Sequence, residues 1–172
     1  MVIIIMGAAG AGKTTVGRHL SNKLGWLFLD GDALHPPESI AKMAHGIPLT
    51  EDDRRPWLHA LRKAIGMWVE RDINAVLACS LLTHTYRVAV LTAHPIQVNQ
   101  IQAKLVYLRA SRALLQARLA ARAGHFAGVA LLESQLALLE EPREEEPVDA
   151  LVLDAAQSPD ELVERIRNRW NL

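Results

Sequence analysis

Short apolar runs alternate along the chain with longer segments in which hydrophobic residues recur at helical spacing. The first run, Val2–Met6, is almost purely aliphatic, as expected of a central strand buried on both faces of a sheet. Similar runs predict the remaining strands at Trp26–Asp30, Ala75–Cys79, Lys104–Leu108 and Ala150–Asp154. The alternation favours an α/β fold, a five-stranded parallel sheet with helices on both faces.

Helices are predicted between and after these runs, and two of them begin with recognisable caps. Thr50, followed by Asp52 and Asp53, forms an N-cap with acidic residues in the first turn. Ser158-Pro159 followed by Glu161 marks another helix start. The predicted helices are Lys13–Leu24, Glu38–Ala44, Asp52–Arg71, Thr85–Ala93, Ser111–Ala123, Ala127–Leu139 and Pro159–Trp170.

Composition narrows the class of protein. A length of 172 residues fits a single domain, and 50% hydrophobic with 22% charged residues excludes a disordered chain. Lys plus Arg and Asp plus Glu both number 19, so there is no net charge to attract nucleic acid or an anionic membrane. The single cysteine, Cys79, excludes an internal disulfide. Without a signal-like leader or an apolar run of ~18 residues, we expect a soluble cytoplasmic protein.

A phosphate-binding loop follows the first predicted strand directly. Gly7-Ala8-Ala9-Gly10-Ala11-Gly12-Lys13-Thr14 matches G-x-x-x-x-G-K-[ST] between a strand and a helix. The glycines allow successive N–H groups to face phosphate oxygens, and the helix start adds its positive dipole end. Lys13 is expected on the β- and γ-phosphates and the Thr14 hydroxyl on Mg²⁺. The predicted ATP-binding residues are Gly7, Ala8, Ala9, Gly10, Ala11, Gly12, Lys13, Thr14 and Thr15.

Other sequence features indicate which class of P-loop protein this is. The chain lacks the D-x-x-G and N-K-x-D motifs of GTPases, and its third predicted strand ends in Ala78-Cys79-Ser80 where many ATPases carry paired acids. A small-molecule kinase instead needs an acceptor pocket beyond the second strand and an arginine-bearing lid. Asp30-Gly31-Asp32 ends the second predicted strand, where ligands of open α/β sheets bind.

The predicted lid spans about residues 118–139. Arg118 and Arg122 have i, i+4 spacing, so both lie on one helical face, and Gly124-His125-Phe126 follows as a candidate hinge. Two arginines so placed can neutralise charge on a transferring phosphoryl group. The alternative is a pair of solvated surface arginines.

Several long runs resemble the P-loop gluconate kinases of the thermoresistant gluconokinase type. They are DGDALHP from Asp30, Lys42-Met43, Gly46, Pro48-Leu49, DRRPWL from Asp53, Cys79-Ser80, Tyr86-Arg87, RLAARAGHF from Arg118, and LESQ from Leu132. The resemblance covers nearly the whole chain in the family's order. It implies a fold like the nucleoside monophosphate kinases, ATP-dependent phosphorylation of D-gluconate to 6-phosphogluconate by direct in-line transfer, Mg²⁺ and a homodimer.

Gluconate carries hydroxyls and a carboxylate, so its pocket needs carboxylates and a cation. We assign Asp32 to the reacting 6-hydroxyl, His35 and His125 to substrate contacts, and Arg54 and Arg87 to the carboxylate. Asp30 is a candidate for the metal site with Thr14, and its role and that of Asp32 are interchangeable at this stage. Arg54 has an alternative as the ion-pair partner of Asp52 or Asp53, and His125 has one as a cap of the lid helix. The predicted catalytic residues are Lys13, Asp32, Arg118 and Arg122.

Two positions depart from the family pattern. Thr83 stands where members often have lysine, which removes a cation near the expected pocket. Ser39 replaces a usual asparagine, an exchange interpreted as one helix cap for another. Two alternatives therefore stay open. One is a P-loop kinase for another small acceptor, such as a different sugar acid, shikimate or a nucleoside monophosphate, and the other is a nucleotide-binding module without catalysis.

Overall fold

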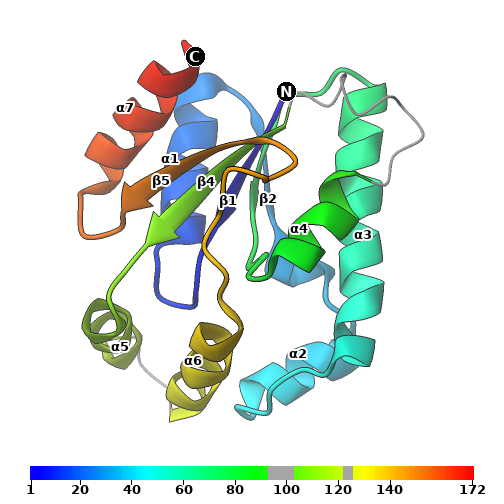
Figure 1. Ribbon diagram of the computed structural model, residues 1–172, viewed down its shortest axis with the longest axis vertical. Helices are drawn as coiled ribbons and strands as arrows, with labels where there is room; N and C mark the ends of the chain where they lie inside the picture. The colour runs from blue at the N-terminus through cyan, green and yellow to red at the C-terminus, as the bar shows by residue number, and fades with distance from the viewer. Residues whose placement is uncertain (93–102, 122–125) are drawn as a thin grey trace.

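Five parallel strands form one sheet in the order β2-β3-β1-β4-β5 (Figure 1). The computed structural model describes residues 1–92, 103–121 and 126–172, with the side chains of 126–130 left out. The strands are β1 Val2–Met6, β2 Leu27–Asp30, β3 Ala75–Ala78, β4 Ala103–Arg109 and β5 Asp149–Asp154. Every residue of β1 is buried, and Ile4 pairs with Leu77 on one side and Leu105 on the other. The predicted parallel α/β sheet with an aliphatic central strand is confirmed.

The helices connect the strands and cover both faces of the sheet (Figure 1). They are α1 Lys13–Leu24, η1 Gly31–Leu34, α2 Pro37–Ala44, α3 Glu51–Glu70, α4 His84–Leu91, α5 Arg112–Ala120, α6 Phe126–Leu138 and α7 Pro159–Trp170. Most bounds lie within one or two residues of prediction, whereas α5 ends at Ala120 and η1 was not predicted at all. The short η1 matters for function because it contains Asp32.

Local side-chain chemistry explains where the helices begin. At α3 the Thr50 hydroxyl accepts from Asp53 N while the Asp53 carboxylate accepts from Thr50 N, which completes a capping box. Ser158 and Glu161 do the same at α7. Both predicted caps are confirmed. Ser39 is different: it lies buried inside α2, whose N-cap is Pro36, so its interpretation as a helix cap is wrong.

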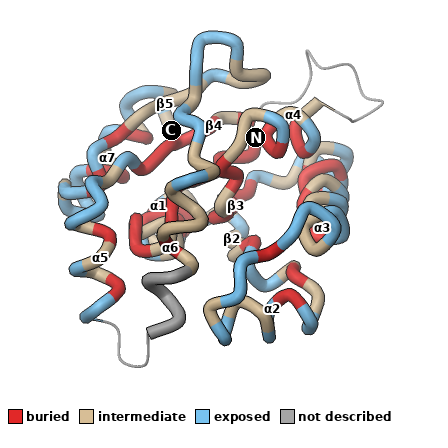
Figure 2. The backbone as a smooth tube through the Cα atoms, turned by 60° about the horizontal axis from the view of Figure 1, so that its bottom comes forward, coloured by how far each residue is buried: buried red, intermediate tan, exposed pale blue. Residues whose placement is uncertain are grey.

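Two hydrophobic clusters fill the space on either side of the sheet. One contains α3 and α4 side chains and the other contains side chains of α1, α5 and α7. Trp57 and Trp68 both point into the first cluster, which identifies them as core residues. Buried stretches, red in Figure 2, run through the sheet and recur along α1 and α3. Within the described residues, no helix is long and apolar enough to span a bilayer.

The fold brings the polar loops together at one end of the sheet. Because the strands are parallel, the loops after β1, β2 and β3 all leave from their carboxyl ends. Helices α2, α5 and α6 lie beyond that end, away from both chain termini (Figure 1). This arrangement places side chains from four separate parts of the chain around one space.

Candidate active site

The loop between β1 and α1 has the backbone conformation that its glycines predict. Gly7, Gly10 and Gly12 have φ values of 149°, 84° and 98°, which L side chains rarely adopt. A Cβ on Gly7 would lie 3.0 Å from Leu108 O, and one on Gly10 would lie 3.0 Å from Leu115 O. Glycine therefore allows the loop to pack closely against β4 and α5.

Lys13, Thr14 and Asp30 meet where the loop passes the end of β2. Lys13 Nζ donates to Ala8 O at 3.1 Å. The Thr14 hydroxyl donates to Asp30 Oδ2 at 2.8 Å, and Asp30 Oδ1 accepts from Asp32 N at 3.2 Å. Asp30 thus caps η1 with one carboxylate oxygen and accepts from Thr14 with the other. Both contacts direct the Asp30 carboxylate toward the phosphate loop. The two carboxylates, whose roles sequence alone left interchangeable, therefore differ in their contacts.

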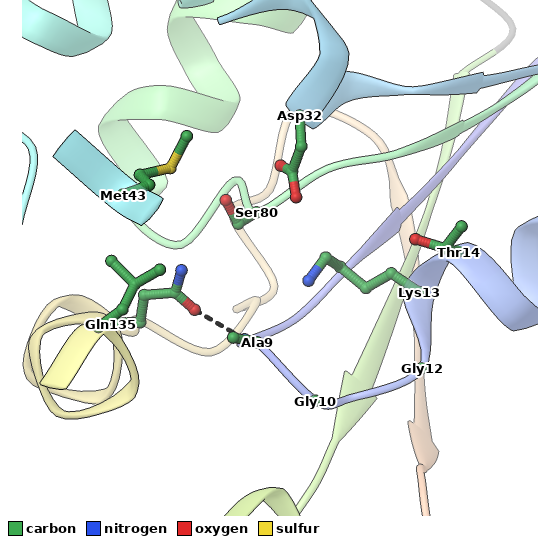
Figure 3. Close-up of a pocket in the computed structure, with 10 residues that line it drawn as sticks. Ala9, Gly10, Gly12, Lys13, Thr14, Asp32, Met43, Ser80 and Gln135 are labelled. Atoms are coloured by element: carbon green, nitrogen blue, oxygen red, sulfur yellow. Dashed lines mark hydrogen bonds between the residues drawn. The ribbon is translucent and has the colours of Figure 1, made fainter. Parts of the chain in front are cut away.

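A cavity of about 140 Å³ opens beside this loop (Figure 3). Lys13 and Asp32 extend toward it from different sides, and Ser80, just after β3, lies beside Asp32. Its lining among the described residues is Ala9, Gly10, Gly12, Lys13, Thr14, Asp32, Met43, Ser80, Leu131 and Gln135. A cation and a carboxylate facing one cavity are the pair of groups that a phosphoryl transfer to a hydroxyl requires.

A second, smaller cavity of about 40 Å³ adjoins the first, since both contain Met43, Ser80, Leu131 and Gln135 in their walls. His35 stacks on Trp57 there, with ring centroids 4.6 Å apart, and Trp57 Nε1 donates to Gly31 O at 2.9 Å. Burial lowers the pKa of His35, so its ring is neutral near pH 7. Among the described residues its buried Nδ1 has no hydrogen-bond partner. An unpaired buried ring nitrogen in a cavity wall is a candidate contact for a ligand hydroxyl.

Arg54 lies in the wall of the same second cavity and is only 15% exposed. Its Nη1 lies 3.0 Å from Glu51 Oε1, and its guanidinium lies over the Tyr86 ring at 5.8 Å. The Tyr86 hydroxyl donates to the same Glu51 oxygen, and burial together with that bond raises the pKa of Tyr86 to about 12. The predicted partners of Arg54 were wrong: Asp52 pairs with Arg55 and Asp53 with Lys42. Arg54 therefore faces a cavity and keeps a single carboxylate partner among the pairs described.

Arg87 does not occupy the place predicted for it. Its side chain is fully buried, and its Nε and Nη2 donate to Glu146 at 2.8 and 2.6 Å. Its Nη1 faces the carbonyls of Leu81, Leu82 and Glu140 at 3.0 to 3.2 Å. The sequence prediction that Arg87 binds the acceptor carboxylate is corrected, because these partners occupy the guanidinium inside the protein.

Arg118 lies on the other side of the phosphate loop from Asp32. Its Nη1 and Nη2 donate to Ala11 O at 3.2 Å and to Ala155 O at 2.7 Å. There it borders a third cavity, of about 310 Å³, together with Gly12, Thr15 and Pro159. Arg118 is therefore not in the wall that Lys13 shares with Asp32. Arg122 and His125, the other two predicted lid residues, lie outside the described residues.

Several residues at these cavities were not singled out by sequence reasoning. Met43, Ser80 and Gln135 border both acceptor-side cavities, and Tyr86 borders the smaller one. All of them fall within the runs that resemble gluconate kinases. That resemblance points to these residues but assigns no role to them. Position 83 is elsewhere: Thr83 caps α4 by accepting from Tyr86 N and is absent from the described walls of both cavities.

Comparison with known proteins agrees with this site. Residues 2–142 match the family described as an AAA domain. The gluconokinase of Gluconobacter oxydans is 39% identical over 95% of this chain and 88% of its own, and the thermoresistant gluconokinase of Escherichia coli is 36% identical over 91% and 85%. The crystal structure of a gluconokinase from Sinorhizobium meliloti superposes with a TM-score of 0.80 at 40% identity, covering 95% of this chain and 87% of that one.

These similarities extend over nearly all of both chains and coincide with a glycine-rich phosphate loop, a cation and a carboxylate around one cavity. They exclude an interpretation of the loop as a chance glycine-rich turn. The chain belongs to the gluconokinase family and has the fold of the P-loop kinases.

Proposed function

We infer that the protein catalyses ATP-dependent phosphorylation of D-gluconate to 6-phospho-D-gluconate. One observation supports this most strongly: the phosphate-loop cavity, which contains Lys13 and Asp32, adjoins a polar side cavity bordered by His35 and Arg54. A triphosphate and an open-chain sugar acid are the two ligands whose chemistry fits those walls. Membership of the gluconokinase family supports the same substrate pair.

The phosphates of ATP bind the ammonium group of Lys13 and the amides of residues 7–15, except those of Ala9 and Ala11, which already donate to Gln135 Oε1 and Ala8 O. Asp32 accepts a hydrogen bond from the 6-hydroxyl and orients its oxygen toward the γ-phosphorus. As the new P–O bond forms, the bond to the β,γ-bridging oxygen breaks, ADP leaves, and the hydroxyl proton passes to Asp32. Lys13 stabilises the negative charge on the phosphoryl oxygens, and this charge is greatest during transfer.

Mg²⁺ fits beside Thr14 and Asp30. A hydroxyl and a carboxylate 2.8 Å apart next to the phosphate loop are hard oxygen donors, as this cation prefers. No group of three or more His, Cys, Asp or Glu side chains able to hold a metal occurs in the part of the chain that is described. That suits a cation held mainly by phosphates with one or two protein oxygens. When bound, Mg²⁺ neutralises phosphate charge.

In the second, smaller cavity, which is the acceptor cavity of this proposal, Arg54 binds the carboxylate of gluconate and His35 binds a hydroxyl. Arg54 is placed for this because its guanidinium is a planar fork that matches a carboxylate, and its other described partners hold it in position. His35, neutral and stacked on Trp57, can accept or donate one hydrogen bond through Nδ1. The two adjoining cavities thus separate the two ends of the substrate: the carboxylate at Arg54 in the smaller cavity and the reacting hydroxyl at Asp32 in the larger one.

Arg118 takes a different role from the one expected for it. Its location beside Gly12, Thr15 and the third cavity favours contact with the nucleoside end of ATP rather than with the transferring phosphoryl group. Arg122 and His125 remain proposed lid residues that close over the phosphates and the acceptor. The homodimer and the cytoplasmic location also belong to this proposal, and light scattering of the purified protein tests the first.

The activity is tested by coupled ADP-release assay over a panel of acceptors: gluconate, other aldonates, shikimate and nucleoside monophosphates. Gluconate should give the highest kcat/KM, with 6-phosphogluconate as the product identified by NMR. Turnover of another acceptor with none on gluconate would refute the substrate assignment. Tight ATP binding with no transfer to any acceptor would instead indicate a binding module.

A further inference from the structure

Gln135 stands where the two acceptor-side cavities meet. It projects from α6 and is one of the residues common to both walls, with Met43, Ser80 and Leu131. Of those four, Met43 and Leu131 offer no strong hydrogen-bond donor. A polar side chain at this junction is therefore placed to contact an acceptor molecule that extends from one cavity into the other.

The orientation of the Gln135 amide is determined by its partner. Ala9 N, in the phosphate loop, donates to Gln135 Oε1 at 2.7 Å (Figure 3). A backbone N–H can only donate, so the atom facing it must be the amide oxygen and not the nitrogen. The NH₂ group is consequently turned away from Ala9, toward the side of the cavity where Met43 and Ser80 lie (Figure 3).

A donor at this place complements the carboxylate on the opposite wall. Asp32, when ionised, only accepts hydrogen bonds, so it takes the hydroxyl that reacts. The neighbouring hydroxyl of a polyol chain presents an oxygen that needs a donor. The Gln135 NH₂ group offers that donor, and the Ala9 N–H bond fixes it relative to the loop that holds the phosphates.

We propose that Gln135 is a positioning residue that binds the acceptor hydroxyl next to the reacting one and so aligns the acceptor with the γ-phosphate. The proposal rests on the proposed kinase function and deepens it: in gluconate the hydroxyl concerned is that on C5. A misalignment of about 1 Å can lower a rate about 10²-fold, so a single neutral hydrogen bond suffices for a large effect.

The test replaces Gln135 by methionine, which is similar in length but has no N–H donor. Q135M should lower kcat/KM for gluconate about 10- to 100-fold. The Kd for ATP and the slow hydrolysis of ATP without an acceptor should change much less, because Q135M removes the acceptor of Ala9 N but leaves Lys13 and the other loop amides to bind the phosphates. E133Q is the matched control on the same helix, since Glu133 pairs with the exposed Arg112 and borders none of the three cavities described above.

Single-deoxy analogues of gluconate identify the hydroxyl. Removing the 5-hydroxyl should reduce kcat/KM for the wild type but cause no further loss in Q135M. Equal losses in ATP binding, hydrolysis and transfer would mean that Gln135 only braces the loop, and wild-type constants in Q135M would also overturn the proposal. Failure of the wild type to phosphorylate gluconate is a separate result, which concerns the proposed function. Q135M and wild type are then compared with the acceptor that the panel identifies. The matching analogue lacks the hydroxyl next to the one that is phosphorylated in this acceptor.

Discussion

Arg87 and Glu146 form a two-point ion pair inside the protein, with exposed side-chain fractions of 0% and 1%. The carboxylate receives Nε at 2.8 Å and Nη2 at 2.6 Å, and His84 Nδ1 lies 3.3 Å from one of its oxygens. The pair joins α4 to the acidic segment ahead of β5, residues 140–147. The run of glutamates in that segment is typical of a solvated loop, yet the Glu146 side chain is among the least exposed charged groups described.

The first prediction is that R87A destabilises the fold rather than the substrate complex. Removal of one partner from a buried ion pair typically costs about 3–5 kcal/mol, because the other charge is left uncompensated. Urea unfolding followed by circular dichroism should show a loss of this size. R109A is the control, since Arg109 forms an exposed pair with Glu141 and its loss should cost about 1 kcal/mol or less. Normal stability together with a raised KM for gluconate would return Arg87 to the acceptor site.

A pH dependence follows from Glu146. Burial opposes its ionisation, but the hydrogen bonds from Arg87 and His84 outweigh burial and hold the pKa of Glu146 below its ordinary value of 4.5. A lowered folded-state pKa contributes stability that is fully present above 4.5 and is lost as pH falls toward the folded value. The free energy of unfolding of the wild type should therefore fall more steeply below pH 4.5 than that of E146Q. Parallel curves for the two proteins would contradict this.

The fold was largely predictable because its signals are local. The aliphatic run of β1, the phosphate-loop motif and the Thr50 cap each depend on residues close in sequence. The fate of Arg87 was not predictable in this way. Its partner lies 59 residues further along the chain, in an acidic stretch whose composition resembles a surface loop. Only the folded contact between α4 and that stretch shows that both side chains are buried.

The same distinction applies within the site. Lys13, Thr14 and Asp32 belong to motifs with a physical mechanism, so their placement around one cavity was anticipated from sequence. Gln135 was not, since a lone glutamine on a helix has no signature, and its contact with Ala9 joins α6 to the phosphate loop across most of the chain. Arg118 is the opposite case. Its spacing from Arg122 predicted contact with the transferring phosphoryl group, but its bonds to the carbonyls of Ala11 and Ala155 hold it beside the third cavity.

Loss of the ammonium group of Lys13 should abolish transfer while the protein stays folded. K13A removes the cation that faces the phosphate cavity, and loss of one such electrostatic contact lowers kcat by about 10²-fold or more. The melting temperature should change little, and K23A, which removes an exposed cation paired with Glu164, should keep wild-type activity. A near-normal kcat in K13A would reject its role on the phosphates.

Asp30 and Asp32 should separate in their metal dependence. D32N removes the acceptor for the hydroxyl proton and should lower kcat about 10²- to 10⁴-fold at saturating Mg²⁺. D30N removes the negative charge and leaves one acceptor oxygen for the two donors, the Thr14 hydroxyl and Asp32 N, so it should raise the Mg²⁺ concentration needed for half-maximal rate. Titration of each variant with MgCl₂ at fixed ATP distinguishes them. If high Mg²⁺ restores D32N instead, the two roles are exchanged.

The neighbouring arginines of α3 provide an internally controlled test of the carboxylate site. Arg54 borders the acceptor cavity and is 15% exposed, whereas Arg55 is 78% exposed and pairs with Asp52 on the surface. A charge-assisted hydrogen bond to a carboxylate contributes about 1.5–3 kcal/mol, so R54A should raise the KM for gluconate about 10- to 100-fold with a smaller change in kcat. R55A should leave both constants unchanged.

The size of the effect on other acceptors decides what Arg54 recognises. With an uncharged polyol of the same length, wild type and R54A should differ little, because the carboxylate that Arg54 contacts is missing. Glu51 and Tyr86 remain as a bonded pair after the substitution, so the cavity wall should keep its shape. If R54A impairs the uncharged polyol as much as gluconate, Arg54 supports the wall of the cavity, and the carboxylate binds elsewhere.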